Sequence, residues 1–281
     1  MPTVQSNNIS LAYEQTGSGP HLLLIAGLGY GGWFWHKVVP GLAQHFTVTT
    51  FDNRGAGGSD KPAGPYTLDQ FAADTAGLIE ALGLAGATVL GHSLGGYIAQ
   101  KLIYSRPELV GKLILASTNL GGMKVIPITP QALAVMTNRT GDPVEVIKRG
   151  VGVATAPGFA EQYGAMVQEL IEYRLTNPVP PANYTAQMMA GAGTASWSEA
   201  QIEAHAAANH VPTLILFGEH DGVVPPGNAQ LIQAKIPHAQ IIILPHVGHI
   251  FPVEDAAATV NTIVQWIQQQ NKKKETERLR D

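Results

Sequence analysis

The sequence predicts an α/β fold with a mostly parallel sheet that helices cover on both sides. Short apolar, β-branched runs at 21–26, 46–51, 87–90 and 112–116 are typical of buried strands. Helical patterns separate these runs, and the clearest of them covers 66–82. Because strands that alternate with helices at this spacing build parallel units, these two observations together predict the fold class.

A third observation is the run Gly91-His92-Ser93-Leu94-Gly95, where a strand turns directly into a helix. The strand ends at Leu90, and the helical pattern begins at Leu94 and continues to Arg106. A turn this abrupt strains the residue at the bend and exposes its side chain above the sheet. Glycines flank that residue because side chains would collide where strand and helix pass closely. Ser93 is therefore the candidate nucleophile, at the positive end of the following helix.

The alternation of strands and helices stops after residue 122, which divides the chain into four segments. We expect a core domain from residues 1–122 that continues at 211–270, with a helical lid inserted at 123–210. The insertion has helical patterns separated by glycine and proline, and no strand pattern. Residues 271–281 are almost all charged, so we expect a solvated, disordered tail.

Composition narrows the class of partner. The 281 residues carry a formal charge of -4 and no cysteine. The mild acidic balance argues against nucleic acid or an anionic membrane as a partner, and the lack of cysteine excludes disulfides and thiolate chemistry. Residues 1–10 lack the pattern of a secretory signal, and no apolar run reaches the length of a membrane span. We therefore expect a cytoplasmic protein, a monomer or a homodimer, that acts on a small molecule.

Candidates for the acid and the base that Ser93 needs follow the later strands. A serine hydroxyl is a poor nucleophile unless a base lies within hydrogen-bond reach and a further group orients that base. In open parallel sheets such groups gather at the carboxyl ends of the strands. Asp221 follows the predicted strand at 213–217. His249 follows the predicted strand at 240–244, so it is the candidate base.

Each of these residues has a rival in its own loop. Glu219 competes with Asp221 as the acid, and His246 competes with His249 as the base. We favour Asp221 because it lies deeper in its turn, beside apolar residues that can exclude water. We favour His249 because Gly248 leaves the loop free to bring the imidazole over the serine.

Two backbone N–H groups are expected to hold the oxyanion of a tetrahedral intermediate. One belongs to Leu94, which directly follows the nucleophile. The other is expected from Leu28, where Gly27 and Gly29 permit the backbone angles that aim an N–H inward. A plain glycine turn would give the same pattern.

Large side chains of the lid and of the glycine-rich loop are expected to line a substrate pocket. The alternative for each of them is packing of the lid against itself. The candidates are Trp33, Met136, Met188 and Trp197.

Taken together, these motifs resemble the α/β-hydrolase superfamily over nearly the whole chain. The matching segments are Ala26–Gly29, Trp33–Trp35, Asp52–Ser59, Gly91–Ala99, Gly218–Asp221 and Gly248–His249. The resemblance implies the α/β-hydrolase fold with a helical lid, and a triad in the chain order Ser, Asp, His. Within the superfamily the chain is most similar to 3-oxoadipate enol-lactonases and related carboxylesterases. Ala26 departs from the pattern, because many members have His there. Since the oxyanion donor is a backbone group, this change should alter the pocket rather than abolish catalysis.

We predict a serine esterase or lactonase that cleaves a small carboxylic ester through an acyl-enzyme on Ser93. His249 relays the proton, Asp221 orients His249, and no metal or organic cofactor is required. Carbon–carbon bond hydrolases and cofactor-free perhydrolases keep the same triad, so both reactions stay open. A small-molecule receptor with slow turnover is a third alternative.

Overall fold

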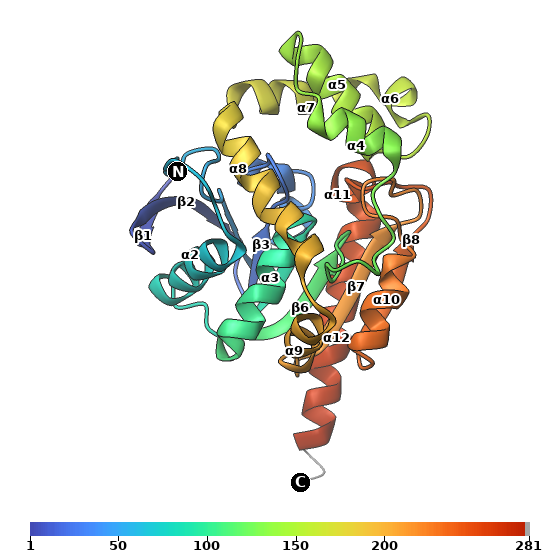
Figure 1. The fold of residues 1–281 in the computed structure, drawn as a ribbon. Coiled ribbons are helices and arrows are strands. Elements are labelled where there is room, and N and C mark those ends of the chain that lie inside the picture. The colour runs from blue at the N-terminus through green and yellow to red at the C-terminus, as the bar shows by residue number, and fades with distance from the viewer. Residues whose placement is uncertain (279–281) are drawn as a thin grey trace.

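A sheet of eight strands organises the chain, in the order β1-β2-β4-β3-β5-β6-β7-β8 (Figure 1). The computed structural model describes residues 1–278. β2 pairs antiparallel with both β1 and β4, and all other neighbours pair parallel. The predicted mostly parallel α/β class is therefore confirmed. The strands are β1 (Thr3–Ser6), β2 (Ile9–Thr16), β3 (His21–Ile25), β4 (Thr47–Phe51), β5 (Ala87–His92), β6 (Val110–Ala116), β7 (Thr213–Gly218) and β8 (Gln240–Leu244).

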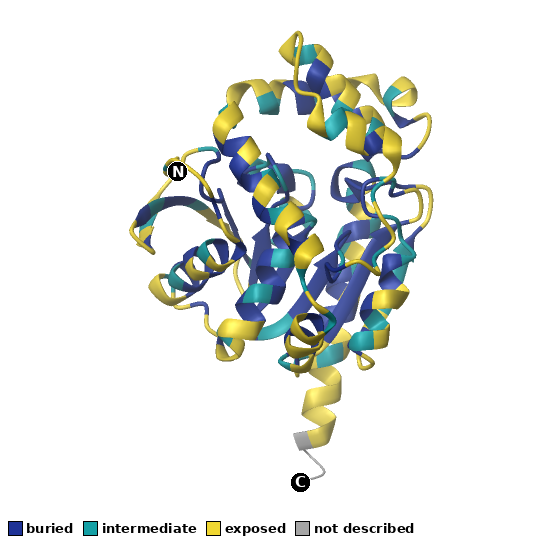
Figure 2. Ribbon diagram, viewed as in Figure 1, coloured by how far each residue is buried: buried dark blue, intermediate teal, exposed yellow. Residues whose placement is uncertain are grey.

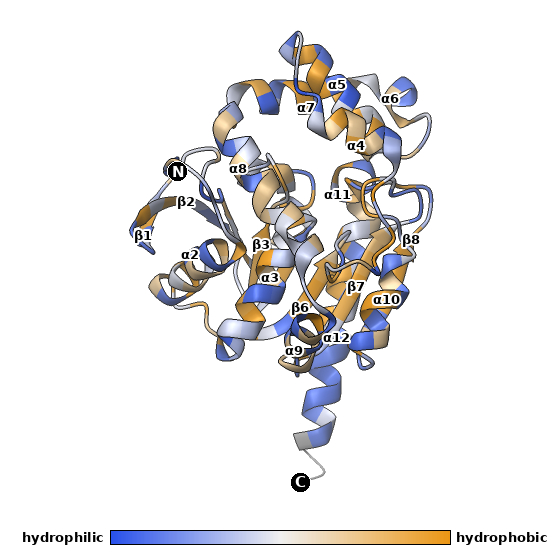
Figure 3. Ribbon diagram, viewed as in Figure 1, coloured by the Kyte–Doolittle hydropathy of each residue, from blue (hydrophilic) through white to orange (hydrophobic). Residues whose placement is uncertain are grey.

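The central strands are buried, as the dark ribbon in Figure 2 shows. Leu22 to Ile25 of β3 are fully buried, and every residue of β5 and β7 is buried. The same strands are the most hydrophobic part of the ribbon in Figure 3. Continuous apolar strands are expected where helices cover both faces of a parallel sheet.

Two layers of helices provide that cover. α2, α3, α9 and α10 contact one another in that order on one face, and α1 packs with α12 on the other (Figure 1). α2 begins at a capping box, in which the side chains of Thr67 and Gln70 each accept a hydrogen bond from the other's backbone N–H. The helices of the core are α1 (Val39–Leu42), α2 (Leu68–Ala81), α3 (Leu94–Ser105), α9 (Glu199–Ala207), α10 (Asn228–Lys235), α11 (Phe251–Glu254) and α12 (Ala256–Arg278). Its 3-10 turns are η1 (Gly32–Trp35) and η2 (Pro107–Leu109).

Every regular element between β6 and β7 is a helix, and most of these helices lie above the carboxyl ends of the strands (Figure 1). α9 falls within the range 123–210 expected as a lid, yet it packs against α3 and α10. It therefore belongs to the helical layer of the core. The lid itself consists of α4 (Pro130–Thr137), α5 (Pro143–Ala154), α6 (Phe159–Gln162), α7 (Gly164–Thr176), α8 (Pro181–Ala192) and the 3-10 turn η3 (Gly193–Ser196).

The expectation of a disordered tail at 271–281 is wrong for residues 271–278, which continue helix α12. Residues 279–281 lie outside the described residues. Lys, Glu and Gln are good helix formers, and each residue added to an anchored helix gains one hydrogen bond. Buried Ile263 and Trp266 supply the anchor, while the end of the helix is exposed and hydrophilic (Figure 2 and Figure 3).

None of the helices in residues 1–278 is long and apolar enough to cross a membrane.

The turn from β5 into α3 depends on two glycines. A Cβ on Gly91 would lie 2.2 Å from the carbonyl oxygen of Gly95. A Cβ on Gly95 would lie 2.2 Å from the carbonyl oxygen of Ile25. Both contacts are with backbone atoms, so no side-chain rotation can relieve them. Strands β3 and β5 and helix α3 approach this closely only because glycine occupies both positions.

We expect Gly91→Ala to destabilise the protein by about 1–3 kcal/mol or more, because the added methyl group forces β5 and α3 apart. The control is Gly152→Ala in α5, where an added Cβ meets nothing within 4 Å. That exposed helical position should gain roughly 0.5–1 kcal/mol, since alanine is the better helix former. Thermal denaturation of both variants measures the two effects. Equal melting temperatures would contradict the role assigned to Gly91.

Candidate active site

Ser93 occupies the bend between β5 and α3, with φ 56° and ψ -118°. Non-glycine residues rarely adopt a positive φ, and such strain costs on the order of 1–3 kcal/mol. The backbone N–H of Ser93 donates a hydrogen bond of 2.9 Å to the carbonyl oxygen of Ala116, which ties the bend to β6. The half-buried Ser93 side chain lines a cavity that His249 also lines.

Asp221 and His249 form a buried pair. Nδ1 of His249 donates to Oδ2 of Asp221 at 2.8 Å, and the residues are 6% and 3% exposed. The other carboxylate oxygen of Asp221 accepts hydrogen bonds from the backbone N–H groups of Val223 and Val224, at 2.9 and 2.7 Å. Because Asp221 holds the Nδ1–H of the imidazole, Nε2 is left available as a base on the side of the cavity.

His92 holds the loop that carries His249. Its Nε2–H donates to the carbonyl oxygen of His249 at 2.8 Å, and the two ring centroids lie 4.8 Å apart. Burial, and secondarily the neighbouring His249, keeps the pKa of His92 well below its ordinary value. His92 is therefore a neutral positioning group for the loop that carries His249.

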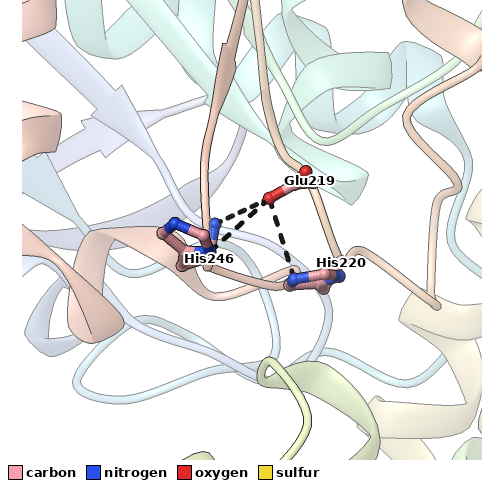
Figure 4. A group of neighbouring side chains, drawn as sticks. All are labelled: Glu219, His220 and His246. Carbon is pink, nitrogen blue, oxygen red and sulfur yellow. Dashed lines mark hydrogen bonds and ion pairs between the residues drawn. The ribbon is translucent and has the colours of Figure 1, made fainter.

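The rivals Glu219 and His246 lie at the surface. Their side chains are 48% and 89% exposed, and neither lines a cavity that Ser93 lines. Figure 4 shows them beside His220, with Nε2 of His220 and Nδ1 of His246 at 3.7 and 3.9 Å from Oε2 of Glu219. Within residues 1–278 this is the one group of three potential metal-ligating side chains whose ligand atoms lie within 4.8 Å of one another. All three residues are exposed.

The expected oxyanion donors are the backbone N–H groups of Leu28 and Leu94. Leu94 is the first residue of α3, and Leu28 is in a turn that the hydrogen bond from Tyr30 N–H to Gly27 O closes at 3.2 Å. Neither N–H donates a hydrogen bond within residues 1–278. Both residues line a cavity together with Ser93. The expected oxyanion donors are therefore unpaired and near the candidate nucleophile.

Gln187 of α8 joins the lid to these loops, and the sequence pattern did not single it out. Its Oε1 accepts from the N–H of Gly29 at 3.0 Å, and its Nε2 donates to the carbonyl oxygen of Arg54 at 2.9 Å. The guanidinium of Arg54 is held in turn by buried Asp74 through two hydrogen bonds of 2.5 and 2.7 Å. One lid residue thus holds the turn that carries a candidate oxyanion donor. A glutamine in a helix has no sequence signal that reveals such a bridge.

Two cavities meet at Ser93, and both also border Leu28, Met136 and Val223. The first cavity extends below lid helices α4, α5 and α7, and its further lining includes His249, Tyr30, Arg139, Arg174 and Tyr184. The second cavity extends towards α8, and its further lining includes Leu94, Tyr97, Val125, Ile128, Met188 and Val224.

Met136 lines both cavities and Met188 lines the second, whereas Trp33 and Trp197 line neither. Trp33 stacks on Tyr173, with ring centroids 5.4 Å apart, and borders a separate cavity near β2. Trp197, which follows η3 at the end of the lid, packs edge-on against His205, with ring centroids 4.6 Å apart. The two tryptophans therefore lie outside the cavities that Ser93 borders, contrary to the expected positions, because their rings pack in the joint between the lid and the core.

Comparison with known proteins places this geometry in a family. A model of the α/β hydrolase fold matches residues 20–256. The chain belongs to the α/β-hydrolase family. A poly(3-hydroxyalkanoate) depolymerase of Ectopseudomonas oleovorans is 30% identical to this α/β-hydrolase over 96% of the chain and 93% of its own length. A hydrolase of Pseudomonas aeruginosa has a structure with a TM-score of 0.79 and 28% identity, covering 95% of this chain and 97% of its own.

An enol-lactonase of Burkholderia xenovorans shares the fold, with a TM-score of 0.78 and 24% identity over 95% of this chain and 100% of its own. The resemblance to the α/β-hydrolase superfamily that the motifs indicated is therefore confirmed.

A second bridge between lid and site in this α/β-hydrolase runs through Glu254 of α11. Its two carboxylate oxygens accept from the N–H groups of Ala156, after α5, and Gly248, beside the candidate base, at 2.7 and 2.9 Å. Burial raises the pKa of Glu254 to about 7, and the negative charge of Asp221 adds to the rise. The carboxyl group is therefore partly protonated near neutral pH.

We expect Glu254 to make the free energy of unfolding fall as pH rises from about 5 to 7. In this window the folded protein retains a proton that the unfolded chain, with a pKa of 4.5, has lost, so raising the pH favours unfolding. Glu254→Gln cannot ionise, and should remove on the order of 1–3 kcal/mol of this decline. Urea denaturation at several pH values measures it, with the exposed Glu161→Gln as control. The same slope in Glu254→Gln and in the unaltered protein would contradict the assignment.

Proposed function

We propose that this α/β-hydrolase is a serine esterase or lactonase that cleaves a small carboxylic ester through an acyl-enzyme. Ser93 is the nucleophile, His249 the general base and acid, and Asp221 the group that orients His249. The single observation that carries the proposal is the buried Asp221–His249 pair, whose imidazole borders the same cavity as the strained Ser93. This is the arrangement that activates a serine hydroxyl.

The proposed reaction has two halves. The Ser93 oxygen attacks the carbonyl carbon while Nε2 of His249 takes its proton, and the N–H groups of Leu28 and Leu94 hold the oxyanion. The intermediate collapses as His249 gives that proton to the leaving alkoxide. Water then attacks the acyl-serine, again with His249 as base, and releases the acid and free Ser93. Each donor to the oxyanion is worth about 2.7–4 kcal/mol of transition-state stabilisation in comparable sites.

The poly(3-hydroxyalkanoate) depolymerase that is 30% identical to this chain supports an ester as the class of substrate. That protein is named a depolymerase of a poly(3-hydroxyalkanoate), whose units are joined by ester bonds. The cavities also suit a small organic substrate, because their lining is mostly apolar with a few polar groups.

We expect a fluorophosphonate to add its mass once to the protein and not to Ser93→Ala. Hydrolysis of a nitrophenyl ester should show rapid multiple turnover, and Ser93→Ala should lose it, because the acyl-enzyme cannot form. Intact-protein mass spectrometry and steady-state kinetics measure these results. Labelling of Ser93→Ala to the same extent would contradict the assignment of the nucleophile.

The loops of Asp221 and His249 each contain a second residue of the same kind, which serves as a matched control variant. Asp221→Asn should lower kcat about 10⁴-fold, by analogy with serine proteases, whereas Glu219→Gln should leave it unchanged. His249→Ala should remove activity, whereas His246→Ala should keep it, because the His246 side chain is 89% exposed and does not line the cavity. If a control variant lost activity and its partner kept it, the roles would be reversed.

A substrate panel separates the other reactions open to this site. Turnover of a vinylogous diketone without turnover of short esters would favour carbon–carbon bond hydrolysis. Slow acylation with no multiple turnover of any ester would favour a receptor for a small molecule.

A further inference from the structure

Two lid arginines border the first cavity, the one that His249 and Ser93 line. Arg139 follows α4, and Arg174 belongs to α7. Within residues 1–278 neither guanidinium forms an ion pair with a carboxylate. By contrast, Arg54 and Arg106 are paired with acids.

The positive charge of this region has no acidic counterpart nearby. No Asp or Glu is among the described residues that line the first cavity, and none lines the adjoining cavity that shares both arginines. Desolvation lowers the pKa of Arg139, and the positive charge of Arg174 lowers it further. Two like charges held together without an anion repel each other, so an anionic ligand would be stabilised there.

Aromatic rings hold both guanidinium groups. Arg174 lies over the ring of Tyr30, with its Cζ 3.9 Å from the centroid, and Arg139 lies over Tyr184 at 4.4 Å. A guanidinium over an aromatic ring is attracted to the face of the ring, and its five N–H donors can still include some that reach a planar anion such as a carboxylate. Nη1 of Arg174 would lie 3.5 Å from a Cβ placed on Gly29, so it approaches the turn that carries Leu28.

The second cavity has the opposite character. The residues that line it include no charged side chain, and most of them are apolar. The two cavities share Ser93, so a bound substrate can place one part in each with its reacting carbonyl between them.

The position of His249 indicates which part of an ester would occupy each cavity. It lines the first cavity and not the second. Since His249 must protonate the leaving oxygen, the leaving group has to lie on its side. Leu94, a proposed oxyanion donor, lines the second cavity, where the acyl part would extend.

We infer that Arg139 and Arg174 form a carboxylate-binding subsite, and that the substrate is an ester whose alcohol part bears a carboxylate and whose acyl part is apolar. This inference rests on the proposed function. Charge-assisted hydrogen bonds from two guanidiniums would hold the carboxylate, and the apolar acyl chain would occupy the second cavity.

The test compares esters that differ only in charge. The butanoyl ester of glycolic acid should have a kcat/KM about 10- to 100-fold above that of the butanoyl ester of glycolamide, after correction for their rates of alkaline hydrolysis. Arg139→Gln and Arg174→Gln should each reduce this ratio about tenfold. A ratio measured within one protein does not depend on the fraction that is folded. Arg149→Gln, an exposed lid arginine that lines neither cavity, should leave both rates unchanged.

Moving the carboxylate tests the assignment of the two cavities. Monoethyl succinate, whose carboxylate is on the acyl part, should show no advantage over the ethyl ester of succinamic acid. An advantage there, equal rates for the two glycolyl esters, or a ratio that neither arginine variant changes would each overturn the inference. If the glycolamide ester is hydrolysed through Ser93 without any preference for the acid, only the subsite is wrong. If no ester is hydrolysed and no fluorophosphonate adds to Ser93, the proposed function itself has failed.

Discussion

The close approach of β3, β5 and α3 is the constraint on which the rest of the site depends. Gly91 and Gly95 let backbone atoms come within distances that any side chain would forbid. The approach leaves Ser93 at a positive φ, and it places the first N–H of α3 beside the turn at Leu28. Strain at one residue is tolerated because hydrogen bonds of the parallel sheet hold β5, which leads into the bend, to both neighbouring strands.

The lid is tied to the catalytic loops by two polar side chains in addition to apolar contact. Gln187 bridges α8 to the turn at Gly29, and Glu254 bridges the segment after α5 to the loop of His249. One bridge is beside the proposed oxyanion donor and the other beside the proposed base. A movement of the lid would therefore act on both chemical groups through hydrogen bonds rather than through a long chain of packing changes.

The charge distribution of the site follows from the same division of the chain. The core supplies the proposed triad, in which Asp221 is buried, whereas the cationic side chains of the first cavity, Arg139 and Arg174, come from the lid. Under the two proposals, substrate preference depends on the lid and the catalytic chemistry on the core.

The sequence by itself determined the local features. Hydrophobic periodicity predicted the parallel sheet, the glycines around Ser93 predicted the strained turn, and the position of Asp221 and His249 after predicted strands placed them at one end of the sheet. These signals depend on neighbours in the chain, where repeat length and backbone sterics act directly. Residues 271–278 are helical despite their high charge, because their side chains favour a helix and the helix that they extend is already anchored.

Only the tertiary structure decided which large side chains meet the site. Trp33 and Trp197 pack in joints between lid and core, while Arg139 and Arg174, from separate segments of the lid, converge on one cavity. The way in which the lid packs on the core decides between these outcomes. That packing involves residues far apart in the chain, so no local pattern predicts it.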